Sequence, residues 1–209
     1  MSLFPIFLKL AGKLVVVVGG GTVAEGKILG LLNAGARIRV VASSITKQIA
    51  EWAGVGKMEW VPKQFAATDL DGVFLVVAAT SAAGVNEAVF RAAEERGILC
   101  NAVDDVERCH FYYGAVVQRG DLQIAISTNG KSPALAQRLR QELEAQFGPE
   151  YEAWVQQLGA ARESLRTGNG DAEVTRKLLH EMASGPMFGR FLREATPRLE
   201  QQPEQQGAT

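Results

Sequence analysis

One short stretch constrains the fold more than any other: residues 14–27, LVVVVGGGTVAEGK, where an aliphatic run meets three glycines. The run Leu14 to Val18 has no polar alternation, which predicts a strand buried on both faces of a parallel sheet. Downstream, apolar residues recur with helical spacing and Gly35 supplies a stop for the helix. The residues on that predicted face are Val23, Ile28, Leu31 and Leu32. The stretch therefore predicts a strand, a glycine turn and a helix.

The turn matches the glycine pattern of dinucleotide-binding folds. In that pattern Gly19 makes the tight turn, Gly21 lets the backbone approach a pyrophosphate, and Ala24 lets the helix pack on the strand. The first amide groups of the helix would bind phosphate. Because any tight turn can need glycine, the pattern alone leaves a purely structural turn open. The second β-branched run, GARIRVVAS, completes a β-α-β unit and favours the nucleotide interpretation.

Strand and helix patterns alternate through about residue 103, which predicts a doubly wound parallel sheet of Rossmann type and a nucleotide-binding domain over residues 1–110. The pattern then changes. FYYGAVVQ and LQIAIST flank a turn at Gly120 and Asp121, which predicts an antiparallel hairpin, and Gly114 predicts a bulge or a close contact. The hairpin carries too many apolar residues for a free ribbon, so residues 111–147 are expected to form a dimerisation region.

Only helical patterns follow, and they predict a small all-helical domain over residues 148–195. Before it, Ser132 is a good N-cap and Pro133 stands at the first helical position, so the helix after the hairpin should begin sharply. Residues 196–209 are polar and are expected to be disordered.

Composition indicates an ordinary globular chain of 209 residues with a net charge of −1. No basic field argues for nucleic acid or for an anionic membrane surface. No stretch is apolar for long enough to span a membrane, and the N-terminus lacks the pattern of a secretory signal, so a cytoplasmic protein is expected. Cys100 and Cys109 have no metal-site spacing; we expect reduced thiols and no bound metal.

Candidate site residues lie where parallel strands end, because ligands bind beyond the carboxyl ends of such strands. Asp104 and Asp105 follow the run ILCNAV, and the choice between a solvated cap and a catalytic base near a nicotinamide is about even. His110 follows closely and is a candidate for the same cleft, although a lone histidine is more often structural. His180, inside a later helix pattern, is a weaker candidate.

The segment STNGKSP offers hydroxyl groups, a lysine and the amides of a new helix within a few residues. Thr128, Lys131 and Ser132 therefore form a candidate site for carboxylates or phosphates. A well-capped helix without a ligand explains the same residues equally well.

Four stretches together resemble the precorrin-2 dehydrogenase family, also met as the N-terminal module of siroheme synthase. They are PIFLKLAGKLVVVVGGGTVAEGK, VVAATSAAGVNEAV, CNAVDD and AVVQRGDLQIAISTNGKSPALAQRLRQELE. The resemblance covers nearly the whole of the first 145 residues. It implies NAD-dependent oxidation of precorrin-2, a carboxylate-rich tetrapyrrole, to sirohydrochlorin, in a homodimer whose subunits exchange the middle region. The chain is expected to be the stand-alone form, without a methyltransferase domain.

The resemblance also implies roles for single residues. Asp104 matches the aspartate proposed to act in catalysis, and Asp105, His110, Thr128, Lys131 and Ser132 are the candidates for binding substrate. Thr128 stands where some relatives carry a phosphorylated serine. The cofactor contacts expected from the resemblance and from the glycine pattern are Gly19, Gly21, Thr22, Val23, Ala24, Ser43, Ala79, Thr80 and Val103.

The sequence favours NAD over NADP, though only modestly. After the second predicted strand no Asp or Glu is present to bind the ribose 2′-hydroxyl, and no arginine is present to bind a 2′-phosphate. Ser43 and Ser44 are the candidates for contacting the ribose, and Lys47 is the one residue noted as favouring a phosphate.

Three alternatives stay open. A nucleotide-sensing module would bind NAD without chemistry, but it has no need of the Asp104 carboxylate. An ordinary alcohol or acid dehydrogenase is weakened by the absence of a Tyr-x-x-x-Lys pair and of a zinc-ligand set. Metal insertion into sirohydrochlorin is expected to be weak or absent beside dehydrogenation, since one His and one or two Asp are too few ligands for a stable metal site.

Overall fold

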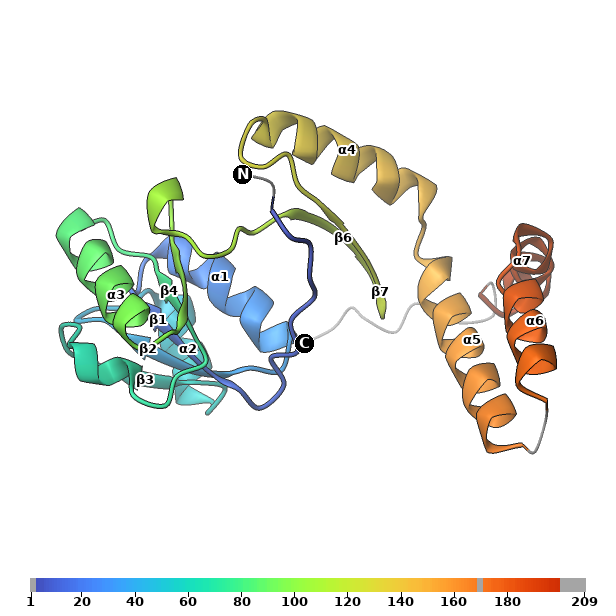
Figure 1. The fold of residues 1–209 in the computed structure, drawn as a ribbon, viewed down its shortest axis with the longest axis horizontal. Helices are drawn as coiled ribbons and strands as arrows, with labels where there is room; N and C mark the ends of the chain where they lie inside the picture. The colour runs from blue at the N-terminus through green and yellow to red at the C-terminus, as the bar shows by residue number, and fades with distance from the viewer. Residues whose placement is uncertain (1–2, 169–170, 200–209) are drawn as a thin grey trace, which may run out of the picture. The chain divides into compact units, whose positions relative to one another are not determined.

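The computed structural model describes residues 3–168 and 171–199, and the chain divides after Tyr113 into two compact units. The first unit holds a five-stranded parallel sheet in the order β3-β2-β1-β4-β5 (Figure 1). Its elements are β1 (Leu14–Val18), α1 (Thr22–Asn33), β2 (Arg37–Val41), α2 (Lys47–Gly54), β3 (Glu59–Val61), the 3₁₀ helix η1 (Ala67–Leu70), β4 (Leu75–Ala78), α3 (Ala83–Glu95), β5 (Leu99–Ala102) and the 3₁₀ helix η2 (Val106–Arg108). The doubly wound sheet that the sequence predicts is confirmed.

The core of this unit lies on both faces of the sheet, because β1 alternates its valines between them. Val15 and Val17 belong to one cluster, together with the buried residues of α1 and α2. Val16 and Val18 belong to the other, which η1 and α3 cover. A central strand buried on both faces needs no polar residue, which explains the continuous aliphatic run.

Helix α1 begins and ends near the expected residues. Gly35, in the left-handed region with φ +72°, follows the C-cap Ala34 and stops the helix. The predicted buried face was wrong at Val23, which is 50% exposed; Ala24, Ile28 and Leu31 are the residues that face the sheet. Ile28 and Leu31 are buried as predicted, and Ala24 takes the place of Val23 in the first turn.

The second unit begins with a β-hairpin of β6 (Ala115–Arg119) and β7 (Leu122–Ile126), and helices follow it (Figure 1). They are α4 (Pro133–Gln146), α5 (Glu150–Thr167), α6 (Ala172–Met182) and α7 (Gly185–Leu199). The hairpin starts later than Phe111, where the sequence pattern began. The carbonyl of Phe111 accepts a hydrogen bond of 2.8 Å from Asn101 on β5, so this residue is tied to the first unit.

Two glycine and capping predictions are confirmed here. A Cβ at Gly114 would lie 2.8 Å from the Ile126 carbonyl oxygen, which is the close contact expected at this position. Ser132 caps α4 by accepting a 3.2 Å hydrogen bond from the Leu135 amide, and Pro133 opens the helix.

The end of the chain differs in part from the expectation. Residues 196–199 were expected to be disordered, but α7 continues to Leu199, anchored upstream where Phe188 and Phe191 pack their rings on Trp154. Residues 200–209, the rest of the expected tail, lie outside the described residues.

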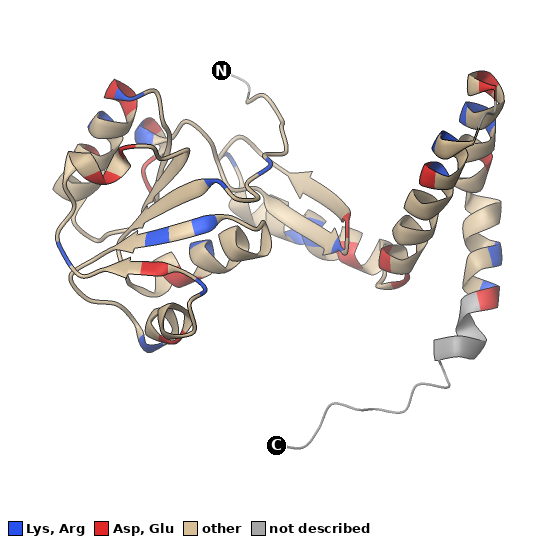
Figure 2. Ribbon diagram, turned by 90° about the horizontal axis from the view of Figure 1, so that it is seen from below, with Lys and Arg blue, Asp and Glu red and all other residues tan. Residues whose placement is uncertain are grey.

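Charges of both signs are interspersed along the helices (Figure 2). Several form ion pairs within one helix, such as Arg138 with Glu142 and Arg190 with Glu194. Over the part of the chain that the structure describes, no helix combines the length and the apolar character that crossing a bilayer requires. Both cysteines are free thiols, with Cys100 buried and Cys109 half-buried.

Candidate functional site

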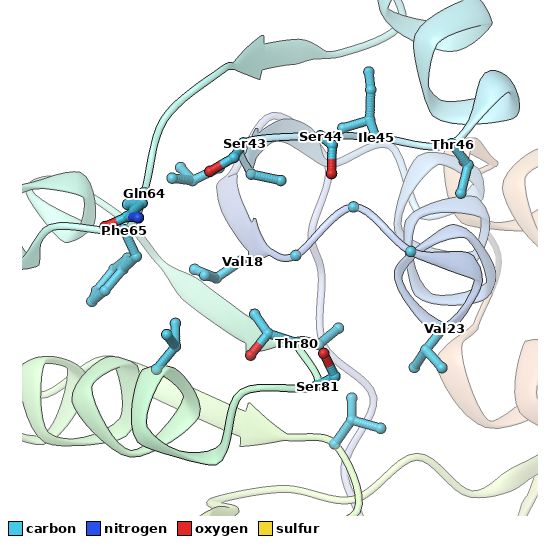
Figure 3. A pocket seen from close by; sticks show the side chains of 18 of the residues that line it. Val18, Val23, Ser43, Ser44, Ile45, Thr46, Gln64, Phe65, Thr80 and Ser81 are labelled. Atoms are coloured by element: carbon cyan, nitrogen blue, oxygen red, sulfur yellow. The ribbon is translucent and has the colours of Figure 1, made fainter.

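A cleft of about 940 Å³ opens at the carboxyl ends of the parallel strands (Figure 3). Segments that follow β1, β2, β3, β4 and β5 all contribute to its lining. It lies where the order of the strands reverses, between β1 and β4. In open α/β sheets this switch point is where ligands bind, and the volume suits a cofactor-sized molecule.

The glycine turn forms the floor of the cleft, and its three glycines have different physical reasons. Gly19 has φ +117°, and a Cβ there would lie 2.3 Å from the Ala79 carbonyl oxygen. A Cβ at Gly20 would lie 2.3 Å from the Ser44 carbonyl oxygen. A Cβ at Gly21 would meet nothing within 4 Å, so only this glycine leaves space that a ligand can occupy. The first two are required by the protein's own packing.

The N-terminus of α1 is suited to a pyrophosphate. Gly21 is the N-cap and has no side chain to bond the first amides, which leaves N–H groups of the first turn for an anion. Thr22 and Val23 line the cleft, while Ala24 lies beneath it, fully buried against the sheet. The residues present therefore fit a dinucleotide, by an open cradle at Gly21 and an uncapped helix end.

Asn86 holds the segment after β4 in place. Its side chain is nearly buried; its Nδ2 donates to the Thr80 carbonyl at 3.0 Å, and its Oδ1 accepts from the Thr80 hydroxyl at 2.8 Å. Thr80 lines the cleft, so Asn86 fixes a residue of the site without lining it. In the sequence, Asn86 has the pattern of an ordinary polar residue in the first turn of a helix, and that pattern does not predict this contact.

Asp104 lines the opposite side of the cleft from β2, two residues beyond the end of β5. Its backbone is left-handed, with φ +63°, a conformation that Asp tolerates better than most residues. The preceding residue, Val103, is fixed by a 2.9 Å hydrogen bond from its amide to the Ala78 carbonyl. The turn thus holds Asp104 at the cleft on a backbone that is fixed one residue earlier.

Lys27 of α1 lies near Asp104 and Tyr113. Its Nζ lies 3.8 Å from the centre of the Tyr113 ring, a cation–π contact. Burial lowers the pKa of the Lys27 ammonium, and the nearby charges of Asp104 and Cys109 act in the opposite direction. Desolvation raises the pKa of the Tyr113 hydroxyl to about 12.

The side chain of Asp105, the neighbour of Asp104, binds another residue of the protein. Its carboxylate pairs with the Arg108 guanidinium at 2.5 Å and accepts a hydrogen bond from the Arg108 amide, which caps η2. The hydrogen bond from Arg108 lowers the pKa of the Asp105 carboxyl. Asp105 is not among the residues that line the cleft.

His110, a candidate for the same cleft, is not among the residues that line it. Its Nδ1 accepts a 3.0 Å hydrogen bond from the Cys100 amide, and its Nε2 lies 2.6 Å from a Glu94 carboxylate oxygen. Glu94 belongs to the last turn of α3 and Cys100 to the first half of β5, so the imidazole lies toward the other end of β5 from Asp104. These contacts are those of a structural histidine, and a role of His110 toward substrate stays a prediction.

Thr128, Lys131 and Ser132 lie together in the second unit. The Thr128 hydroxyl accepts from the Ser132 amide at 3.1 Å, and the Thr128 carbonyl accepts from the Lys131 amide at 3.0 Å. The three residues form the turn that opens α4, as a capped helix requires. Their role toward a substrate stays a prediction.

The cleft brings together most of the expected cofactor residues: Gly19, Gly21, Thr22, Val23, Ser43, Ala79, Thr80 and Val103, with Asp104. Sequence reasoning missed the wall formed after β3 by Lys63, Gln64 and Phe65; Figure 3 shows Gln64 and Phe65 on the side of Ser43. Lys47 does not line the cleft, and its side chain is 93% exposed. No group of three or more His, Cys, Asp or Glu placed to hold a metal occurs among the described residues.

Comparisons with known proteins agree with this geometry. Residues 6–115 match a family model described as NAD(P)-binding, and residues 119–146 match one for the central part of sirohaem biosynthesis proteins. A solved structure entitled "SirC, precorrin-2 dehydrogenase" is 31% identical, with a TM-score of 0.76; the match covers 93% of this chain and 100% of that one.

Curated relatives are longer than this chain. Siroheme synthase 1 of Serratia proteamaculans is 44% identical over 145 residues, which are 69% of this chain and 30% of the relative. Siroheme synthase of Neisseria meningitidis serogroup C is 35% identical over 202 residues, 97% of this chain and 42% of the relative. The chain thus spans less than half the length of these two relatives.

The family match confirms a nicotinamide dinucleotide as the cofactor expected from the glycine turn. Both halves of the chain are accounted for, the first by the NAD(P)-binding model and the second by the sirohaem model and the likeness over the full length of SirC. The chain belongs to the family of NAD(P)-binding sirohaem-biosynthesis proteins that includes precorrin-2 dehydrogenase and the N-terminal part of siroheme synthases.

Proposed function

We propose that the protein catalyses the NAD-dependent dehydrogenation of precorrin-2 to sirohydrochlorin. The observation that carries this proposal is the position of Asp104, the one carboxylate among the residues that line a cleft suited to a dinucleotide. The choice of precorrin-2 as substrate rests on the names of the similar proteins. Their sequence similarity to this chain extends over nearly all of it.

The reaction removes one hydride and one proton from the reduced macrocycle. Bound NAD supplies the hydride acceptor. In this proposal Asp104 takes the proton; it follows β5 and lies on the side of the cleft opposite to the residues after β2 that are the candidates for the ribose. The uncapped N-terminus of α1 and the open space at Gly21 would hold the pyrophosphate of the dinucleotide.

The experiment mixes the purified chain with precorrin-2 and NAD and follows the absorbance of NADH and of the macrocycle together. Formation of one NADH for each sirohydrochlorin is the expected result. NAD binding without turnover would instead support the alternative, a nucleotide-sensing module. Insertion of cobalt or iron into sirohydrochlorin is expected to stay at the uncatalysed rate or a little above it.

We further propose that the protein acts as a homodimer that exchanges the region of residues 111–147. Val116 on β6 and Leu135 on α4 are 42% and 39% exposed within one chain, which supports a partner surface over the hairpin and its helix. Sedimentation at micromolar concentration is expected to give the mass of two chains. A monodisperse monomer would contradict the exchanged architecture.

A further inference from the structure

The cleft is nearly uncharged, and its two charged residues lie far apart along the sheet. Among the lining residues, Lys63 is the single cation and Asp104 the single anion. Lys63 follows β3 and Asp104 follows β5, and these are the two outer strands in the order β3-β2-β1-β4-β5. If Asp104 is at the nicotinamide end, Lys63 is at the adenosine end.

The register of the strands places Lys63 beside the ribose position. Val41 of β2 pairs with Val61 of β3, and the Ala42 amide still donates to the Val61 carbonyl at 3.3 Å. Ser43 and Lys63 each come two residues after that pair. Neighbouring strands are about 4.8 Å apart, so the two residues leave the sheet side by side. In dinucleotide folds the end of β2 is where the ribose 2′-oxygen is recognised.

The Lys63 ammonium is already paired. Its Nζ lies 2.6 Å from Oδ1 of Asp69, whose side chain is only 10% exposed. The other oxygen of Asp69 accepts a 2.9 Å hydrogen bond from the Ala66 amide. Both carboxylate oxygens are therefore engaged, and Asp69 is fixed in η1 with its charge directed at Lys63.

We propose that Asp69, by holding and neutralising Lys63, determines the preference for NAD over NADP at this cleft. The inference rests on the proposed function, in that the cleft must bind the dinucleotide. With Lys63 paired, the ribose 2′-oxygen meets the neutral hydroxyls of Ser43 and Ser44, which suit a 2′-hydroxyl. A 2′-phosphate would need a cation at this position that is free to pair with it. Lys63 is the cation that lines the cleft, and it is already paired with Asp69.

The test measures the dissociation constants of NAD and NADP by calorimetry on the full chain, without tetrapyrrole. Asp69→Asn keeps an oxygen for the Ala66 amide but removes the charge that holds Lys63. We expect its affinity for NADP to rise about tenfold, about 1.4 kcal/mol, while its affinity for NAD changes little. Adding Lys63→Met to Asp69→Asn should abolish the gain.

Asp71→Asn is the matched control. Asp71 lies two residues away and pairs with Arg96 at 3.3 Å, and neither residue lines the cleft. This variant should bind both cofactors as the wild type does. An equal gain in NADP affinity from Asp71→Asn would overturn the inference, because it would point to a general change in charge.

A second variant keeps the inference testable if Asp69→Asn does not fold. Lys63→Met leaves the Asp69 carboxylate unpaired near the ribose, so NADP binding should fall further and the ratio of NAD affinity to NADP affinity should rise above that of the wild type. Unchanged NADP binding in both variants would overturn the inference alone, because NAD binding would remain. A wild type that bound neither dinucleotide would contradict the proposed function as well.

Discussion

Residues 1–113 and residues 114–209 bury their apolar side chains to very different extents. The first unit has a cluster on each face of its sheet, with β1 and β4 almost completely covered. Among the described residues of the second unit, the buried apolar side chains are those of Val117, Ala136 and Trp154. Apolar burial is the main stabilising term of folding, so we expect the first unit to be more stable by itself than the second.

The difference separates the two parts of the proposed function. A cleft that binds a cofactor needs rigid walls, and the closely packed first unit supplies them through its glycine turn and strand ends. The second unit exposes Val116, Leu135, Val174 and Leu178, which fits a unit that gains its remaining burial from a partner chain.

The largest expected effect is on folding, when the two units are produced as separate fragments. A fragment of residues 1–113 is expected to unfold cooperatively and to bind NAD. A fragment of residues 114–209 is expected to lose its circular-dichroism signal on dilution, because its folded state needs association. Sedimentation and circular dichroism over a range of concentrations check both expectations. A second fragment that stayed folded as a monomer at micromolar concentration would break the comparison.

The second largest effect concerns the chemistry of the first unit. Asp104→Ala should lower the rate of precorrin-2 dehydrogenation by about 10² to 10⁴, the usual contribution of a general base. NAD affinity should change little, because the phosphate cradle is at α1. Asp105→Asn is the matched control, since Asp105 is paired with Arg108 and should leave the rate nearly unchanged. A full rate in Asp104→Ala would remove this residue from catalysis.

Substitutions at Gly19 and Gly21 separate two roles of the glycine turn: packing against the protein and leaving space for a ligand. Gly19→Ala should destabilise the protein by about 2 kcal/mol or more, because its φ is positive and the new Cβ would meet the Ala79 carbonyl. Gly21→Ala should leave the unfolding free energy within about 0.5 kcal/mol, since its Cβ enters open space.

The same open space is where a pyrophosphate would lie, so Gly21→Ala should weaken NAD binding about tenfold, about 1.4 kcal/mol. Thermal unfolding without cofactor and titration with NAD separate the two effects. Equal loss of stability in both variants would show that Gly21, too, is required by the protein's own packing.

Local patterns predicted the parts of the structure that local physics determines. The continuous valines of β1, the stop at Gly35 and the Ser132 cap each depend on residues close in the sequence. Other contacts could not be predicted in this way. In the sequence, Asn86 and Lys63 have the pattern of solvated polar residues. Their contacts with Thr80 and Asp69 form only when the loops at the strand ends fold back. The same reason applies to His110. Because it is close to Asp104 in the sequence, it was a candidate for the same cleft, but its side chain contacts Glu94 instead.

The smallest predicted effect concerns the cap at Asp105. Because Arg108 lowers the pKa of this carboxyl in the folded protein, the ionised form stabilises the fold above the unfolded pKa of about 3.9. The contribution disappears as the pH falls through the lower, folded pKa. Asp105→Asn should therefore melt slightly below the wild type at pH 7, and the difference should vanish in strong acid.

Both the Asp105 carboxylate and the Arg108 guanidinium are partly exposed, so salt should reduce the difference in melting temperature at pH 7 as well. A difference that persisted unchanged at low pH would show that packing of the side chain, rather than its charge, holds the turn that carries Asp104.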